Sequence, residues 1–126
     1  MSLPTDRRYL VTHEWHKPEG DTIVIGITQF AADELTDITF VDLPKIGTSV
    51  KAGGRFGEIE SVKATSDLYS GVAGTVSAVN DKLTTDAGLV NRDPFGAGWM
   101  IKLKPANAAD VNGLLSAADY STKTGH

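Results

Sequence analysis

Two stretches of the chain have a two-residue period, with a large apolar residue at every second position. In the second stretch Lys102 and Lys104 lie on the other face. A period of two residues is typical of β-strands that bury one face and expose the other. We therefore predict two half-buried strands. Their apolar residues are Ile23, Ile25 and Ile27 in the first strand and Trp99, Ile101 and Leu103 in the second.

Further short strands are expected between turn sequences. Proline and glycine mark the turns, as in PKIG at residues 44–47 and KAGG at residues 51–54. Many short strands at this spacing predict a mainly β fold, either a sandwich or a barrel. The strands cover residues 37–43, 55–61, 66–69 and 74–80.

Two short helices interrupt the β pattern. The first is predicted at residues 29–35, with Thr28 as its N-cap. The second is predicted to begin at Asn107, where Asp110 takes the place of a capping-box partner. Because neither helix is long, we expect both to flank a single β domain that spans residues 1–126.

Composition narrows the classes of function. The 13 glycines fit a turn-rich β protein. The 12 basic and 16 acidic residues give a net charge of −4 without a basic cluster, so nucleic acid is not an expected partner. The absence of cysteine excludes disulfides and thiolate metal sites. Since no stretch has the length of a membrane span or the form of a signal peptide, we expect a cytoplasmic protein without membrane contact.

The side chains do not form a recognisable catalytic or metal site. His13 and His16 are three residues apart, whereas zinc proteases place two histidines four apart on a helix, and Pro18 and Gly20 oppose a helix here. Residues 66–68 contain the residue types of a phosphopantetheine attachment motif, but in the wrong order. No nucleophile elbow or phosphate-binding loop is present. We expect no metal site and a chain that is not itself an enzyme.

Lys63 stands in the predicted hairpin turn between residues 55–61 and 66–69. Such turns normally use Asn-Gly or Asp-Gly, but here Val62 and Ala64 flank the lysine. An exposed lysine is usually only a solvated charge. At this tip, however, its small or smooth neighbours leave the amine accessible, which is what covalent attachment of a prosthetic group needs. We therefore predict a swinging arm that presents one group to several active sites.

Around this lysine the sequence resembles a known family. ESVKA at residues 60–64, followed by Ser66, Asp67 and Tyr69, is similar to the lipoyl-attachment hairpin of the glycine cleavage system H-protein family. Biotin domains favour methionines beside the lysine, and lipoyl domains of 2-oxo acid dehydrogenases favour an aspartate before it, so the residues here fit neither pattern fully. The other similar segments, in the family's order, are residues 13–15, 24–28, 40–44, 79–80 and 91–99.

Two residues depart from the pattern that the resemblance implies. Gly71 stands where the family commonly has proline, and Gln29 stands where an acidic residue is frequent. We expect the glycine to loosen the bend after the strand at residues 66–69 without touching the attachment site.

The resemblance implies a mainly β, barrel-sandwich hybrid fold with short flanking helices. One lipoyl-carrier domain would span residues 1–126, with an N-terminal extension and a C-terminal helix. Lipoate would be joined to Lys63 by an amide and would supply the sulfur chemistry that a chain without cysteine lacks. The arm would rest in a cleft, and His13, Glu14 and Asp67 are the candidate residues around its charged end.

The resemblance also implies partners. The arm would carry an aminomethyl group from a glycine decarboxylase (P protein) to an aminomethyltransferase (T protein), and electrons to a dihydrolipoyl dehydrogenase (L protein). A lipoate ligase or lipoyl transferase would attach the arm. The chain would catalyse none of these steps and would shield the carried group from water. In a eukaryote the expected location would be the mitochondrial matrix.

Other interpretations of the same residues stay open. The chain could be an H-like protein that relays lipoate to other enzymes, or another lipoyl or biotinyl carrier domain. A third interpretation is an unmodified interaction domain. A neighbouring gene for a decarboxylase would favour glycine cleavage, whereas neighbouring acyltransferase genes would favour lipoyl relay.

Overall fold

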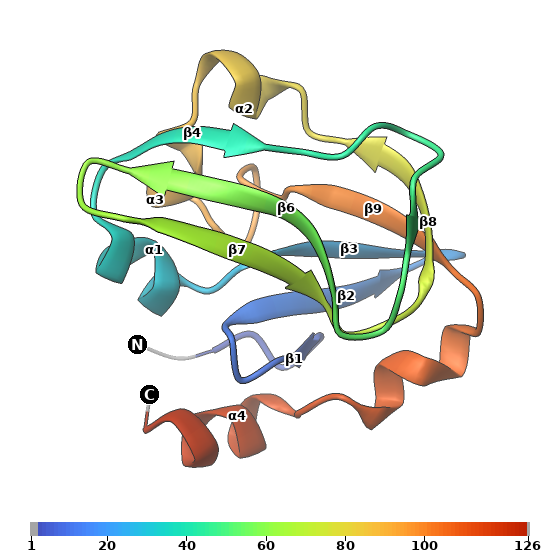
Figure 1. The fold of residues 1–126 in the computed structure, drawn as a ribbon. Helices are drawn as coiled ribbons and strands as arrows, with labels where there is room; N and C mark the ends of the chain where they lie inside the picture. Colours follow the sequence, from blue (N-terminus) through green and yellow to red (C-terminus); the bar gives the residue numbers. More distant parts are fainter. Residues whose placement is uncertain (1–2, 126) are drawn as a thin grey trace.

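The structure is a computed structural model that describes residues 3–125. Within this range the chain forms two antiparallel sheets, which face each other in Figure 1. The larger sheet consists, in spatial order, of β1 (Arg8–Tyr9), β2 (Glu14–Glu19), β3 (Thr22–Ile27), β9 (Ile101–Pro105), β8 (Gly74–Val79) and β5 (Ser49–Val50). The smaller sheet consists of β4 (Ile38–Asp42), β6 (Gly54–Ser61) and β7 (Thr65–Ser70).

Short helices flank this sandwich. They are α1 (Gln29–Leu35), α2 (Lys82–Thr85), α3 (Leu89–Arg92), the 3₁₀-helix η1 (Ala108–Gly113) and α4 (Ala117–Thr124). The first predicted helix is confirmed as α1, and its cap is Thr28, whose side chain accepts a hydrogen bond from the backbone N–H of Ala31. The sequence pattern did not predict α2 and α3.

The prediction of a C-terminal helix that begins at Asn107 is correct for its start but wrong for a single helix in this part of the chain. The Asn107 side chain does cap a helix, but that helix is η1. The backbone then becomes extended so that Leu115 can pair with Tyr9 through two hydrogen bonds of 2.8 and 3.0 Å. Ser116 caps a new helix, α4, which runs beside β1 in Figure 1. The long-range pairing with β1 therefore divides what local capping signals suggested was one helix.

The prediction that β3 is half-buried is also wrong. Ile23, Ile25 and Ile27 face the main core, but Val24 on the opposite face is only 5 % exposed. Val24 belongs to a second hydrophobic cluster with Tyr9, Trp15 and Tyr120. The N-terminal segment and α4 cover this outer face, so β3 is buried on both sides.

In the later strand, Ile101 and Leu103 face the main core as predicted. Trp99 does not share their face, because it precedes β9 and packs against the second cluster. The ammonium group of Lys102 lies 5.3 Å from the centre of its ring. The apolar alternation thus holds only inside the strand itself.

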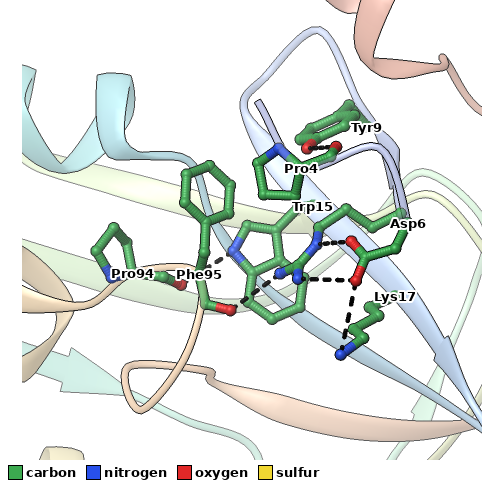
Figure 2. A network of polar contacts seen from close by, with 8 residues as sticks. Pro4, Asp6, Tyr9, Trp15, Lys17, Pro94 and Phe95 are labelled. Carbon is green, nitrogen blue, oxygen red and sulfur yellow. Dashed lines mark hydrogen bonds and ion pairs between the residues drawn. The ribbon is translucent and has the colours of Figure 1, made fainter. Parts of the chain in front are cut away.

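Trp15 fixes the N-terminal part of β2 within the second cluster. Its indole N–H donates to the backbone carbonyl of Pro94 over 3.0 Å, and its ring lies beside Phe95 in Figure 2. The Arg7 guanidinium lies 4.6 Å above the indole ring and donates to the carbonyl oxygen of Phe95. Asp6 pairs with Arg7 at 2.8 Å. These contacts hold in place the start of β2, where Glu14 precedes the indole.

No helix in residues 3–125 has the length and apolar character that a membrane crossing requires.

Candidate functional site

Lys63 lies exposed at the tip of the hairpin formed by β6 and β7. The turn closes with the backbone N–H of Ser61 donating to the carbonyl of Ala64 over 2.8 Å. The Ser61 hydroxyl oxygen accepts from the N–H groups of Lys63 and Ala64 at 3.2 and 3.0 Å. Among the described non-glycine residues only His13 and Thr36 have positive φ, so this turn needs neither glycine nor asparagine. A serine side chain replaces the usual turn residues by binding the backbone.

Two hydrogen bonds tie the tip to its neighbours. The N–H of Val62 donates to the carbonyl of Asp37, just before β4, over 3.0 Å. The Lys63 ammonium donates to the backbone carbonyl of Glu34 in α1 over 3.1 Å. In Figure 1 the green hairpin accordingly ends beside α1 and the start of β4. The lysine amine is therefore held on the side of the hairpin that faces α1.

A cleft of about 250 Å³ opens beside this lysine, and Glu34 is part of its rim. The cleft lies between α1, β7 and the turn that precedes β2. Its walls are mostly apolar. The apolar side chains are Ile27, Phe30, Ala31, Leu35, Ile59 and Leu68. Such a cavity suits an aliphatic chain, because removing apolar surface from water stabilises binding by about 25 cal/mol per Å².

Glu14 supplies a buried carboxylate to this cleft. Although it begins β2, it is only 1 % exposed. The Thr12 hydroxyl donates to one carboxylate oxygen over 2.5 Å, and the backbone N–H of Tyr69 donates to the other over 2.9 Å. Burial raises the pKa of Glu14 to about 7, although both hydrogen bonds act in the opposite direction. The carboxyl group therefore changes charge near neutral pH.

His13 also lines the cleft, from the turn before β2. Its φ of 81° is in the left-handed region, which costs a residue with a Cβ about 1–3 kcal/mol. Backbone hydrogen bonds hold it there: its N–H donates to Leu10 over 3.0 Å, and its carbonyl accepts from Thr28 over 2.9 Å. Its ring packs 4.9 Å from that of Phe30 in α1. The turn and the start of α1 thus form one wall.

Asp67 lies on the opposite, β7 side of the cleft. The Arg55 guanidinium donates to one of its oxygens over 2.8 Å, and the Tyr69 hydroxyl donates to the other over 3.4 Å. Its charge is therefore shared with an exposed arginine, unlike that of Glu14. The structure brings His13, Glu14 and Asp67 to one cleft, with Lys63 at its rim; their roles stay predictions.

The side chains of the two nearby histidines have different surroundings. His13 faces the cleft, whereas the Nε2 atom of His16 accepts a hydrogen bond from the N–H of Gly71 over 2.9 Å. Burial lowers the pKa of His16 to about 4, so it is neutral and able to accept. Within residues 3–125 no group of three or more histidine, aspartate or glutamate residues is arranged to hold a metal ion.

Comparison with known proteins identifies the family. The family model described as "Glycine cleavage H-protein" matches residues 7–126, which is nearly the whole chain. The chain belongs to the glycine cleavage H-protein family. The resemblance found around Lys63 is thereby confirmed for the chain as a whole.

Individual family members match over almost their full lengths. The glycine cleavage system H protein of Opitutus terrae is 54 % identical over 125 residues, which cover 98 % of each chain. That of Nitratidesulfovibrio vulgaris is 56 % identical over 120 residues, covering 95 % of this chain and 93 % of the relative.

A solved structure confirms the fold of the family. The crystal structure of a glycine cleavage system H protein from Mycobacterium marinum superposes with a TM-score of 0.88 at 37 % identity, and the match covers 98 % of this chain and 100 % of that one. The mainly β barrel-sandwich fold with short helices is therefore confirmed.

Sequence reasoning missed two contributors to the cleft. Thr12 donates to Glu14 from the turn before β2, where no strand periodicity marks the contact. Glu34 contributes its backbone carbonyl to Lys63, and no side-chain pattern announces such a contact. The polar end of the cleft is thus built partly from backbone groups.

Proposed function

We propose that this chain is the lipoyl-bearing shuttle of the glycine cleavage system, with lipoate attached to Lys63. The observation that supports this most directly is the exposed lysine amine at the rim of an apolar cleft that contains a buried carboxylate. An amide nitrogen retains one N–H, so the carbonyl of Glu34 can still accept from the modified side chain. Family membership supports the same role.

The residues present fit a lipoyl group. The apolar walls suit its aliphatic chain, and the buried carboxylate of Glu14 suits a cationic end. When bound, the group would supply dithiol and disulfide chemistry for carrying an aminomethyl group and electrons. The chain's own residues would bind the arm, exclude water and hold positive charge.

Glu14 is the residue that we propose holds the cationic end. A nearby cation favours the ionised form, so binding would lower the raised pKa of this carboxyl group. Asp67 and His13 would border the same end of the cleft. None of these side chains needs to change covalently, which agrees with a carrier that is not itself an enzyme.

We propose three enzymes as partners in turn: glycine decarboxylase, aminomethyltransferase and dihydrolipoyl dehydrogenase. A lipoate ligase or lipoyl transferase would modify Lys63. The cytoplasmic location stays a prediction.

The test is reconstitution with a glycine decarboxylase. The modified chain should support incorporation of labelled bicarbonate into the carboxyl group of glycine, whereas the unmodified chain and Lys63→Arg should not. If the modified chain gives no exchange but donates its lipoyl group to a 2-oxo acid dehydrogenase domain through a lipoyl transferase, its main role is lipoyl relay and the proposal is wrong.

A further inference from the structure

Tyr120 reaches the cleft wall from α4. It belongs to α4, is fully buried and does not line the cleft itself. Its hydroxyl is hydrogen-bonded to Nδ1 of His13 and lies 3.3 Å from the hydroxyl of Thr28. His13 lines the cleft, and Thr28 caps α1. One hydroxyl group therefore touches both segments that form this wall.

The burial of Thr28 favours one direction for these hydrogen bonds. The Thr28 hydroxyl oxygen accepts from the N–H of Ala31 over 3.2 Å, and because Thr28 is fully buried its own hydrogen needs an acceptor. The oxygen of Tyr120 can be that acceptor, since either hydroxyl of this pair can donate. In this arrangement the Tyr120 hydroxyl donates to Nδ1 of His13, and the hydrogen of the neutral imidazole is on Nε2.

Tyr120 is itself held rigidly. Its ring stacks on that of Tyr9, with ring centres 5.0 Å apart and planes 24° apart. The backbone pair between Tyr9 and Leu115 and the Ser116 cap fix the start of α4. In Figure 1 the red helix α4 accordingly lies below β1. A rigid hydrogen-bond partner can therefore orient the His13 ring.

We propose that Tyr120 is a positioning residue for the arm cleft, acting through His13 and Thr28 to fix the wall that keeps water from the carried group. This inference rests on the proposed function. It gives α4, which lies outside the two sheets, a part in protecting the arm. Loss of the Tyr120 hydroxyl should therefore speed the reaction of the carried group with water.

The matched test compares Tyr120→Phe with Tyr9→Phe. Each removes one tyrosine hydroxyl from the same stacked pair and keeps the aromatic ring. The hydroxyl of Tyr9 donates to the carbonyl of Pro4 over 2.6 Å and has no part in the cleft contacts. Both variants should lose similar stability, so that only an effect on the cleft separates them.

The first readout uses the unmodified chain. Nitrogen NMR shifts of the His13 ring at a pH where it is neutral should show the hydrogen on Nε2 in the parent and in Tyr9→Phe. In Tyr120→Phe the share of the tautomer with the hydrogen on Nδ1 should rise. A parent in which His13 carries its hydrogen on Nδ1 overturns the proposed direction, and with it the inference, without any variant having to fold.

The second readout is the rate at which the aminomethyl-loaded chain loses this group to water without partner enzymes. A lost buried hydrogen bond predicts a rate about 3–10-fold faster in Tyr120→Phe. Tyr9→Phe should stay within about twofold of the parent, as expected for a hydroxyl outside the cleft. Equal rates in the two variants overturn the inference alone. A parent that takes no aminomethyl group contradicts the proposed function, and the inference falls with it.

Discussion

The hairpin tip and the floor of the cleft, where Glu14 lies, place charged side chains in opposite surroundings. At the tip, Lys63 is exposed, and its turn is built by the adjacent Ser61. At the floor, Glu14 is buried, and its carboxylate is held from β7, 55 residues away. An attachment site must be reachable by a modifying enzyme, whereas a protective site must exclude water. Attachment and protection therefore need neighbouring regions of opposite exposure.

The largest expected effect is at the tip. Lys63→Arg should abolish lipoylation, because a guanidinium group stays protonated and is not an effective nucleophile. The free energy of unfolding should change by no more than about 0.5 kcal/mol, as expected for an exposed residue. Intact mass and denaturant unfolding measure the two quantities. A large loss of stability would mean that Lys63 has a structural role.

The floor should instead make stability depend on pH. Burial raises the pKa of Glu14 from 4.5 to about 7, so the folded chain holds a proton there that the unfolded chain releases. The associated stability is complete below about pH 4.5 and is lost as the pH rises through about 7. Between pH 5 and pH 8.5 the parent should lose about 2–3 kcal/mol more than Glu14→Gln.

Denaturant unfolding of both proteins at several pH values tests this expectation. The pair of proteins cancels contributions from other groups, including His16, whose neutral form is common to both. Parallel curves for parent and Glu14→Gln would mean that Glu14 is solvated like the groups at the tip.

Glu14→Gln should also speed loss of the aminomethyl group from the loaded chain. A charge-assisted hydrogen bond in a water-poor cleft is worth about 1.5–3 kcal/mol, so the acceleration should be tens of fold. The control is Glu58→Gln, which breaks an exposed ion pair of 3.1 Å with Arg55. Its effect should be at most about fivefold, the limit for a surface pair. Equal rates in Glu14→Gln and parent would remove Glu14 from the site.

The smallest predicted effect concerns the bend after β7. Gly71 does not loosen this bend as expected, because its N–H donates to buried His16. Gly71→Pro removes that donor and should cost about 1–3 kcal/mol. In a His16→Leu background the same change should cost less, since no acceptor is left unpaired. The steric contact that the added proline side chain makes with Leu114 is the same in both backgrounds. Equal costs in the two backgrounds would show that the hydrogen bond contributes nothing.

Local signals explain which parts of the fold were predictable. The strands at residues 55–61, 66–69 and 74–80 and the helix at residues 29–35 were found because alternation, turn residues and the Thr28 cap are encoded nearby. β2 was not predicted as a strand, because Trp15 and His16 on its two faces are both buried and no alternation marks it.

The candidate site divides in the same way. Lys63 was identifiable from its turn, and Ser61 could have explained it through its backbone hydrogen bonds. His13, Glu14 and Asp67 were proposed through the family resemblance. The contacts that set their surroundings join distant parts of the chain, such as the hydrogen bond between His13 and Tyr120, which are 107 positions apart. Such contacts leave no periodic pattern in the sequence.

The most direct test of the central claim is to locate the lipoyl group in the natively expressed chain. Intact mass gives the number of groups, and peptide mapping gives their position. We predict one lipoyl group, in the peptide that contains Lys63, and none on the other lysines. Lipoate on Lys51 or Lys82, or a chain that a lipoate ligase leaves unmodified, would contradict the assignment of the hairpin tip as the attachment site.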